Sequence, residues 1–217
     1  MTSNQLLRIS GVAMLAGAST FAGHIILRSV LTAGPDPTAF ALNPLWMPVS
    51  ALGVIGAVLV LMGLPAAFVR IVGAAGLSGV VGLALLALAW MLFGLFFSLY
   101  SLLILPWLAD KAPALVTARA ALPTPMLGAF LFGLLTWFVG ALLLGAPFIR
   151  GHAQPAWLGY VVAGSAAWIL ISNAVLAPRG PAPNLAINLL SNLGPILLLV
   201  GVAYLARPEI AKPPVGE

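Results

Sequence analysis

The sequence predicts an all-α integral membrane protein, a polytopic bundle of about six transmembrane helices. Of its 217 residues, 62% are hydrophobic and only 6% are charged, whereas a soluble globular chain carries roughly 25% charged residues. The few charges divide the chain into apolar windows, and each window is long enough for the ~20 residues that one membrane-crossing helix needs. Lipid is therefore the solvent that suits this chain, and residues 1–217 are expected to form a single transmembrane domain.

The windows between charged residues define the expected helices in order. Proline fixes φ and removes a backbone donor, so helices end beside the proline clusters, such as Pro35–Pro37 after the first window and Pro178–Pro183 before the last. Arg70 is expected to mark a tight turn between the second and third helices. The predicted helices span about residues 6–31, 45–69, 72–105, 125–149, 155–177 and 184–206.

Two of these helices have unusual features. The third window has no proline between Pro65 and Pro106, so its helix would be roughly 50 Å long at 1.5 Å per residue and would tilt or protrude from the bilayer. In the sixth helix, Gly194 and Pro195 predict a kink or a break beside Asn192.

The composition, rich in Ala, Gly, Leu and Pro and with seven Arg against two Lys, is typical of a bacterial chain, so we expect a multi-pass protein of the bacterial inner membrane. The distribution of basic residues predicts that both termini lie in the cytoplasm. This orientation places five basic residues inside: Arg8, Arg70, Arg150, Arg207 and Lys212. It places four outside or at the outer membrane edge: Arg28, Lys111, Arg119 and Arg179. In an alternative interpretation, the first apolar segment is a cleaved signal peptide, which would leave five spans.

Polar residues within the windows indicate a candidate ligand-binding site. Residues spaced four apart share one helix face, and polar groups in lipid mark functional sites because they cost free energy unless they are paired. The topology brings polar residues of helices 1, 5 and 6 to a similar depth, opposite the termini, and Ser98 of helix 3 falls at the same depth. The candidate residues are Thr20, His24, Arg28, Asn173, Asn188 and Asn192.

A structural role is the alternative for the same residues. Asparagine side chains join membrane helices through hydrogen bonds worth about 0.6 kcal/mol each on average. Arg28 can extend its charge to the membrane surface or pair with Asp36.

The composition excludes several chemistries. The chain has no cysteine, which removes disulfides, thiolate nucleophiles and cysteine-ligated metals. Its acidic residues lie outside the predicted helices and only His24 of the two histidines lies within one, so we predict neither catalytic residues nor a metal site and identify no cofactor. Basic residues occur singly rather than in runs, which argues against nucleic acid binding.

Several short stretches resemble sequences of other bacterial membrane proteins. The segments Ile9–His24, Pro44–Trp46, Gly63–Pro65 and Leu105–Ala109 resemble a loose group of uncharacterised membrane proteins of actinobacterial and chloroflexal type. The resemblance implies a compact bundle of about six spans and brings no catalytic residues.

The absence of catalytic groups favours a non-enzymatic protein that acts by binding, either as a receptor for a hydrophobic ligand or as an accessory subunit of a membrane complex. Its expected partners are the lipid bilayer and either other membrane subunits or further copies of itself. A small transporter or channel that uses the polar cluster is the alternative, and a membrane enzyme using His24 and Arg28 is the third.

Overall fold

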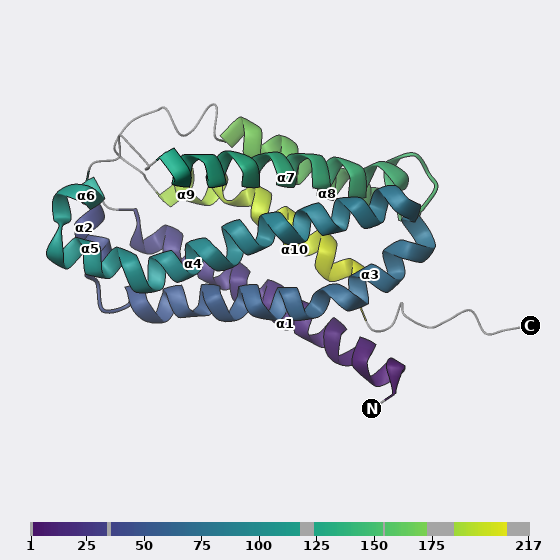
Figure 1. Ribbon diagram of the computed structural model, residues 1–217, viewed down its shortest axis with the longest axis horizontal. Coiled ribbons are helices and arrows are strands. Elements are labelled where there is room, and N and C mark those ends of the chain that lie inside the picture. Colours follow the sequence, from purple (N-terminus) through teal and green to yellow (C-terminus); the bar gives the residue numbers. More distant parts are fainter. Residues whose placement is uncertain (1, 34–35, 118–123, 154, 173–184, 208–217) are drawn as a thin grey trace, which may run out of the picture.

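The computed structural model describes residues 2–33, 36–117, 124–153, 155–172 and 185–207, which form helices and turns without a β-strand among them (Figure 1). The long helices are α1 (Ser3–Leu31), α3 (Trp46–Trp90), α7 (Thr124–Ile149), α8 (Ala156–Ile171) and α10 (Leu193–Leu205). The short elements are α2 (Pro37–Ala41), the π-helix η1 (Met91–Phe96), α4 (Phe97–Leu99), the π-helix η2 (Tyr100–Ile104), α5 (Leu105–Lys111), α6 (Pro113–Thr117) and α9 (Leu185–Ser191).

The helical run from Trp46 to Lys111 is folded into two antiparallel legs. Gly76 has φ 60° and ψ −159°, a conformation that is essentially restricted to glycine, and the chain reverses there (Figure 1). The Trp90 indole donates a hydrogen bond to the Ala57 carbonyl at 3.3 Å, and the Trp46 indole donates one to the Ser101 carbonyl at 2.8 Å. Later residues of the second leg thus pair with earlier residues of the first, as in a hairpin.

The expected turn at Arg70 was wrong. The first leg continues from the expected end at residue 69 to Ala75, and Arg70 lies inside it. Its guanidinium lies 5.6 Å from the centre of the Tyr204 ring of α10, so the charge is accommodated on an aromatic face rather than in a loop. Glycine at position 76, not charge at position 70, determines where the chain turns.

The second leg also ends later than the expected residue 105, at Lys111. Pro106 does not stop it, because proline is tolerated in the first turn of a helix, where its missing N–H has no intrahelical partner. Before this proline the second leg passes through the π-helices η1 and η2, in which the helical turns are wider than in an α-helix. The second leg is therefore one continuous helical run.

The remaining predicted helices agree with the structure to different extents. α1 begins at Ser3, three residues before the expected residue 6, because Thr2 and Gln5 form a capping box. α7 matches the expected 125–149 closely. α8 covers the start of the expected 155–177, and the part beyond residue 172 lies outside the described residues. The predicted break in the sixth helix is confirmed, since α9 and α10 meet at Asn192 with a bend of 43°.

The described legs lie alongside one another in one bundle (Figure 1). The start of α1, the turn within α3, the connection between α7 and α8 and the end of α10 lie at one end, which we call the terminal end. The helices α2, α5 and α6 and the start of α9 lie at the opposite end, here called the distal end.

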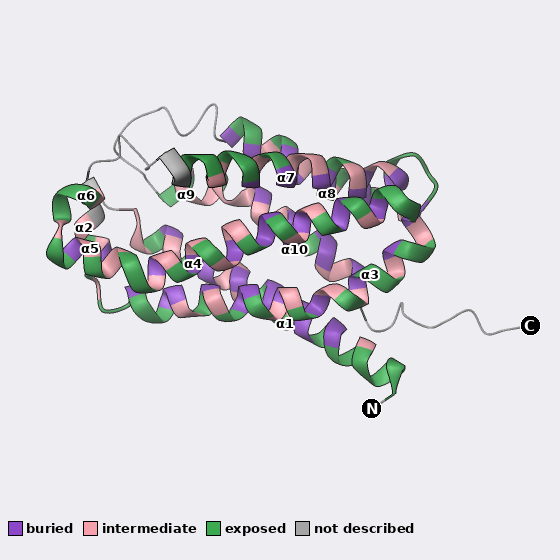
Figure 2. Cartoon of the chain, viewed as in Figure 1, coloured by how far each residue is buried: buried purple, intermediate pink, exposed green. Residues whose placement is uncertain are grey.

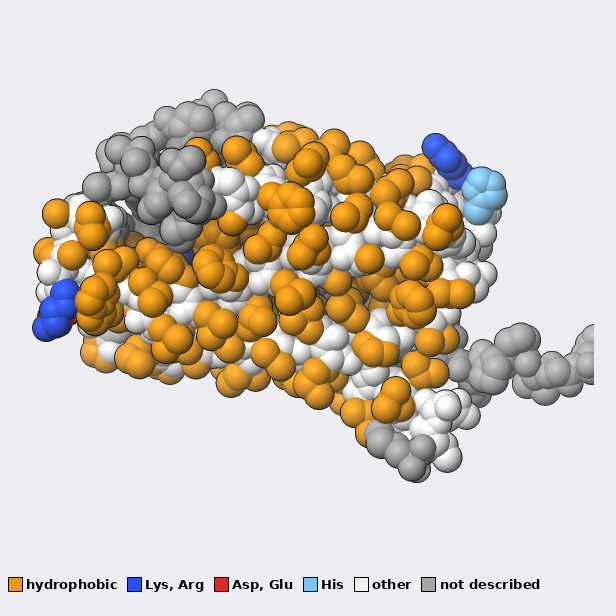
Figure 3. Space-filling model, in the orientation of Figure 1, with side chains coloured by type: hydrophobic (Ala, Val, Ile, Leu, Met, Phe, Trp, Pro, Cys, Tyr) orange, Lys and Arg blue, Asp and Glu red, His pale blue; other side chains and the backbone are white. Residues whose placement is uncertain are grey.

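The outside of the bundle is apolar. Figure 2 shows that exposed residues follow the outer faces of the helices, and many of them are large hydrophobic residues, such as Leu103 and Tyr160. On the face seen in Figure 3, hydrophobic side chains cover the sides, and the Lys, Arg and His side chains in view lie mainly at the two ends. An apolar belt between polar ends is compatible with a membrane protein.

Length and composition identify the helices that can cross a membrane. They are α1, the folded run Trp46–Lys111 and residues Leu127–Ile149 of α7, with the bent pair α9–α10 as a fourth if it counts as one span. α8 is apolar but shorter.

Close glycine contacts hold α1 against the first leg of α3. A methyl group on Gly63 would lie 2.4 Å from Cβ of Met14, and one on Gly17 would lie 2.5 Å from the backbone nitrogen of Val60. α7 and α8 meet in the same way at Gly145 and Gly159. Small residues let helix backbones approach, which is how helices pack in lipid.

Tryptophans lie near both ends of the bundle and differ in exposure. Trp107 is 59% exposed at the distal end and Trp157 is 43% exposed near the terminal end. Trp46, at the start of the first leg, is fully buried, because Phe40 of α2 packs on its ring with centroids 4.9 Å apart.

Candidate ligand-binding site

A cavity of about 380 Å³ lies inside the distal half of the bundle. A volume of this size is within the range of small-molecule sites, roughly 300–1,000 Å³. Its wall includes residues from all the long helices: Phe21, His24, Ile25, Arg28, Ser29, Thr32, Trp90, Phe93, Gly94, Phe97, Ser98, Phe130, Leu134, Trp137, Ile169, Ser172, Asn188, Ser191, Asn192 and Pro195.

The structure brings four of the six predicted site residues together. His24, Arg28, Asn188 and Asn192 all line the cavity. Thr20 does not line the cavity, although it lies on α1 with His24 and Arg28. It lies one helical turn nearer the terminal end than His24, where the rings of Phe21 and Trp90 close the space with centroids 4.6 Å apart. Asn173 lies outside the described residues.

His24 is fixed in one orientation. It is only 2% exposed, and its Nδ1 lies 2.7 Å from the Val49 carbonyl oxygen. A carbonyl oxygen can only accept, so Nδ1 carries the proton and donates it. In the neutral ring, Nε2 then has a lone pair that can accept a hydrogen bond from a ligand. Gly53 leaves the room for this ring, since a methyl group there would lie 2.8 Å from Nε2.

Arg28 carries the positive charge of the cavity. Its guanidinium carbon lies 5.7 Å from the centre of the buried Trp46 ring, which orients the charge without neutralising it. The acidic side chains among the described residues are Asp36 and Asp110, and neither pairs with Arg28. Asp110 forms a salt bridge with Lys111.

The anticipated pair of Arg28 with Asp36 does not form. Asp36 caps α2, where one carboxylate oxygen accepts hydrogen bonds from the backbone nitrogen and the hydroxyl of Thr38 at 2.8 and 2.7 Å. These bonds lower the pKa of Asp36 below its usual value, so the carboxylate remains ionised at its own helix.

The two asparagines connect the bent pair of helices α9 and α10 to α1. The Asn188 amide nitrogen donates to the Ser29 carbonyl at 3.2 Å and to the Thr32 hydroxyl at 3.1 Å. That of Asn192 donates to the Asn188 carbonyl at 2.8 Å and lies 3.5 Å from the Ser29 hydroxyl. These bonds support the structural alternative for the asparagines: they hold the α9–α10 break against the cavity wall.

Aromatic rings form a further part of the cavity wall. Phe93 of η1 stacks on Phe97 at 5.7 Å, meets Phe130 edge-on at 5.4 Å and lies 6.0 Å from Trp137. Gly133 makes room for Phe93, because a methyl group there would lie 2.7 Å from the phenyl ring. The site therefore has a polar side on α1 and α9 and an aromatic side on η1, α4 and α7.

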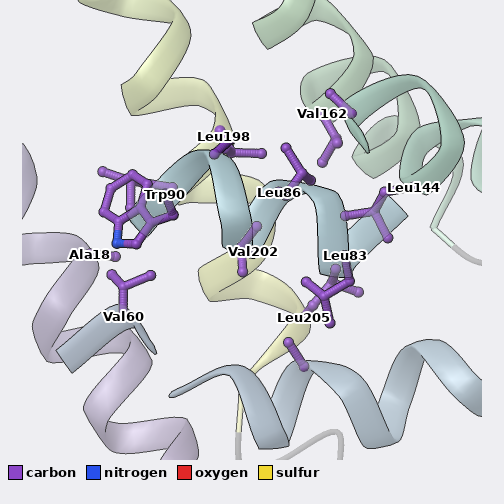
Figure 4. Packing of buried hydrophobic residues seen from close by; sticks show 14 of the residues in the cluster. Ala18, Val60, Leu83, Leu86, Trp90, Leu144, Val162, Leu198, Val202 and Leu205 are labelled. Carbon is purple, nitrogen blue, oxygen red and sulfur yellow. The ribbon is translucent and has the colours of Figure 1, made fainter. Parts of the chain in front are cut away.

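Buried residues pack closely on the terminal side of the cavity and leave a space of only about 20 Å³ among them. Figure 4 shows Trp90 beside the aliphatic residues Leu86, Leu198 and Val202, with Val60 on the other side of its ring. All of these residues are at most 6% exposed. In the described structure the cavity is consequently a blind pocket rather than a pore through the bundle.

Sequence reasoning identified the polar wall but missed the aromatic one. Phe93 and Phe97 are four residues apart, a spacing that places two rings on one helix face. Trp90 and Trp137 line the cavity as well. Ser29 and Thr32, which anchor the asparagines, give no signal in a single sequence.

Comparison of the chain with family models, curated proteins and solved structures found no match.

Proposed function

We propose that this protein is a multi-pass membrane protein that binds an amphiphilic ligand with an acidic head group in the distal cavity. The acidic group pairs with Arg28, a hydroxyl or amide of the ligand donates to Nε2 of His24, and an apolar or aromatic body lies against Phe93, Phe97 and Phe130. The two chemically different walls of one cavity support a ligand with two chemically different parts.

The membrane setting is part of this proposal. Six apolar legs, the two of the folded α3 run among them, would give six spans with both termini on the cytoplasmic side of a bacterial inner membrane. The apolar outer faces and the polar ends support insertion. The charge distribution of the sequence supports the orientation.

The main support for the proposal is that the charge of Arg28 has no acidic partner among the described residues. A guanidinium inside an apolar bundle costs free energy that an acidic partner offsets. No acidic side chain among the described residues supplies that partner. A hydrogen bond to a charged group contributes about 1.5–3 kcal/mol, which corresponds to roughly 10- to 100-fold in affinity.

Thermal stabilisation by matched ligands tests this function. Long-chain and aryl-alkyl carboxylic acids are compared with their primary amides, which have a similar shape but no charge. The purified wild-type protein should be stabilised more by acids than by amides. Arg28→Gln should abolish this difference, whereas Arg150→Gln, which alters an exposed arginine at the other end, should keep it. Equal stabilisation of wild type by acids and amides would contradict the proposal.

Transport is the second candidate, and the break between α9 and α10 favours it. Discontinuous helices line the substrate sites of many transporters, and this break adjoins the cavity through Asn192 and Pro195. Transport requires a second conformation in which the packed aliphatic residues on the terminal side of the cavity separate. Accumulation of a stabilising acid in reconstituted vesicles, lost in Arg28→Gln, would establish transport. Binding without accumulation would indicate that the protein is a receptor rather than a transporter.

A further inference from the structure

A second group of charges lies at the terminal end of the bundle, away from the distal cavity. The guanidinium carbons of Arg70 and Arg207 lie 5.6 and 5.0 Å from the centre of one ring, that of Tyr204. Trp157 of α8 packs edge-on against the same ring at 4.8 Å. Residues from the first leg of α3, from α8 and from the end of α10 thus converge on Tyr204.

The hydrogen bonding of this group is incomplete. Nη1 of Arg70 is buried without a hydrogen-bond partner. The described acidic residues, Asp36 and Asp110, belong to the distal end. Two like charges beside one ring repel each other, and the cation–π attraction to tyrosine, about 0.5–2 kcal/mol each, offsets only part of the desolvation of a half-buried guanidinium.

We propose that Arg70, Arg207 and Tyr204 bind the phosphate of an anionic phospholipid head group. Arginine matches phosphate geometry with two parallel N–H donors, and one phosphate bound by both guanidiniums would offset one of their two positive charges. The Tyr204 hydroxyl supplies a further donor. No covalent step is involved.

The depth of the site fits a head group. Trp157 is half-exposed beside it, and tryptophan prefers the membrane–water interface. The end of the bundle that carries the termini is the side we assign to the cytoplasm, where anionic lipids attract basic residues near the surface by about 1 kcal/mol each. This inference rests on the membrane setting proposed above but not on the ligand of the distal cavity.

The test is lipid retention, measured by native mass spectrometry after delipidation in a non-ionic detergent and addition of phosphatidylglycerol or phosphatidylcholine. Wild type should retain phosphatidylglycerol in preference to phosphatidylcholine. Arg70→Gln and Arg207→Gln should each reduce this preference about tenfold. Tyr204→Phe, which keeps the ring, should reduce it less than Tyr204→Leu. Arg207 is exposed, so its variant gives a result even if Arg70→Gln fails to fold.

Matched controls separate the possible outcomes. Arg150→Gln removes an exposed arginine from the same end and should leave the preference intact; an equal loss there would show only general attraction and overturn the site. Stabilisation by inorganic phosphate alone, lost in Arg207→Gln, would confirm the phosphate chemistry but assign it to a soluble ligand. The absence of a phosphatidylglycerol preference in wild type overturns the proposal, even if a preference appears after Glu209→Gln and Glu217→Gln. Arg28→Gln should not alter the result, so this test is independent of the distal cavity.

Discussion

His24 has two ring nitrogens with separate roles. Nδ1 donates to the Val49 carbonyl at 2.7 Å and joins α1 to the start of α3. Nε2 can accept a hydrogen bond from the ligand. A substitution that retains one nitrogen position and removes the other can therefore distinguish structure from binding.

Replacement of His24 by asparagine and by alanine makes this distinction. The Asn amide nitrogen occupies the position of Nδ1, so His24→Asn should keep thermal stability within a few degrees of wild type while weakening binding of the stabilising acids. His24→Ala removes a buried ring and its hydrogen bond, which should lower the free energy of unfolding by about 2–4 kcal/mol. Thermal unfolding with and without the acid measures both effects. Unchanged binding in His24→Asn would limit His24 to a structural role.

At the same scale, the sequence predicted part of the site because polar residues are rare inside apolar windows. Four of the six predicted residues line one cavity. Thr20 was misplaced because four-residue spacing gives the helix face but not the depth at which Phe21 and Trp90 close the space. The role of the asparagines depends on partners 156 and 159 residues away in the chain, which a single sequence does not show.

At the scale of elements, the packing of α1 against the first leg of α3 depends on glycine. A methyl group on Gly63 would meet the backbone and Cβ of Met14 at 2.4–2.8 Å, whereas one on Gly23, also on this pair of helices, meets nothing within 4 Å. Backbone atoms cannot rotate away as a side chain can, so the helices would have to separate.

Alanine substitution at these glycines tests that packing. Gly63→Ala should lower the free energy of unfolding by about 1–3 kcal/mol, the usual cost of overpacking. Gly23→Ala should be neutral or slightly stabilising, because alanine favours the helix by about 1 kcal/mol over glycine. Denaturant titration in detergent, followed by circular dichroism, gives both values. Equal effects of the two substitutions would show that the close contact at Gly63 is not important for stability.

The helical elements themselves were predictable because apolar windows and proline clusters are local signals. The break beside Asn192 followed from Gly194 and Pro195. The turn between the two legs of α3 was misplaced because a charged residue was taken as a loop residue, whereas Arg70 is stabilised by the ring of Tyr204, which comes from the far end of the sequence. Burial of Trp46 depends likewise on the short helix α2, which the apolar pattern does not indicate.

At the scale of the whole molecule, the bundle has different chemistry at its two ends. The distal end contains the cavity with Arg28, and the terminal end contains the two arginines beside Tyr204. Buried aliphatic residues pack beside Trp90 of the cavity wall (Figure 4). This division fits a receptor that takes its ligand from the distal side while its other end is held at the opposite membrane surface.

The most direct test of the central claim is the mass of whatever remains bound to Arg28 after gentle purification. Native mass spectra of wild type, Arg28→Gln and Arg150→Gln are compared in the same mild detergent. We expect one defined small acidic compound, present in wild type and Arg150→Gln and absent or strongly reduced in Arg28→Gln. A compound retained equally by all three proteins would contradict the assignment of the distal cavity. A ligand-free protein bound to a stoichiometric partner protein would show instead that the chain is a subunit, with the polar cluster serving to pack its helices.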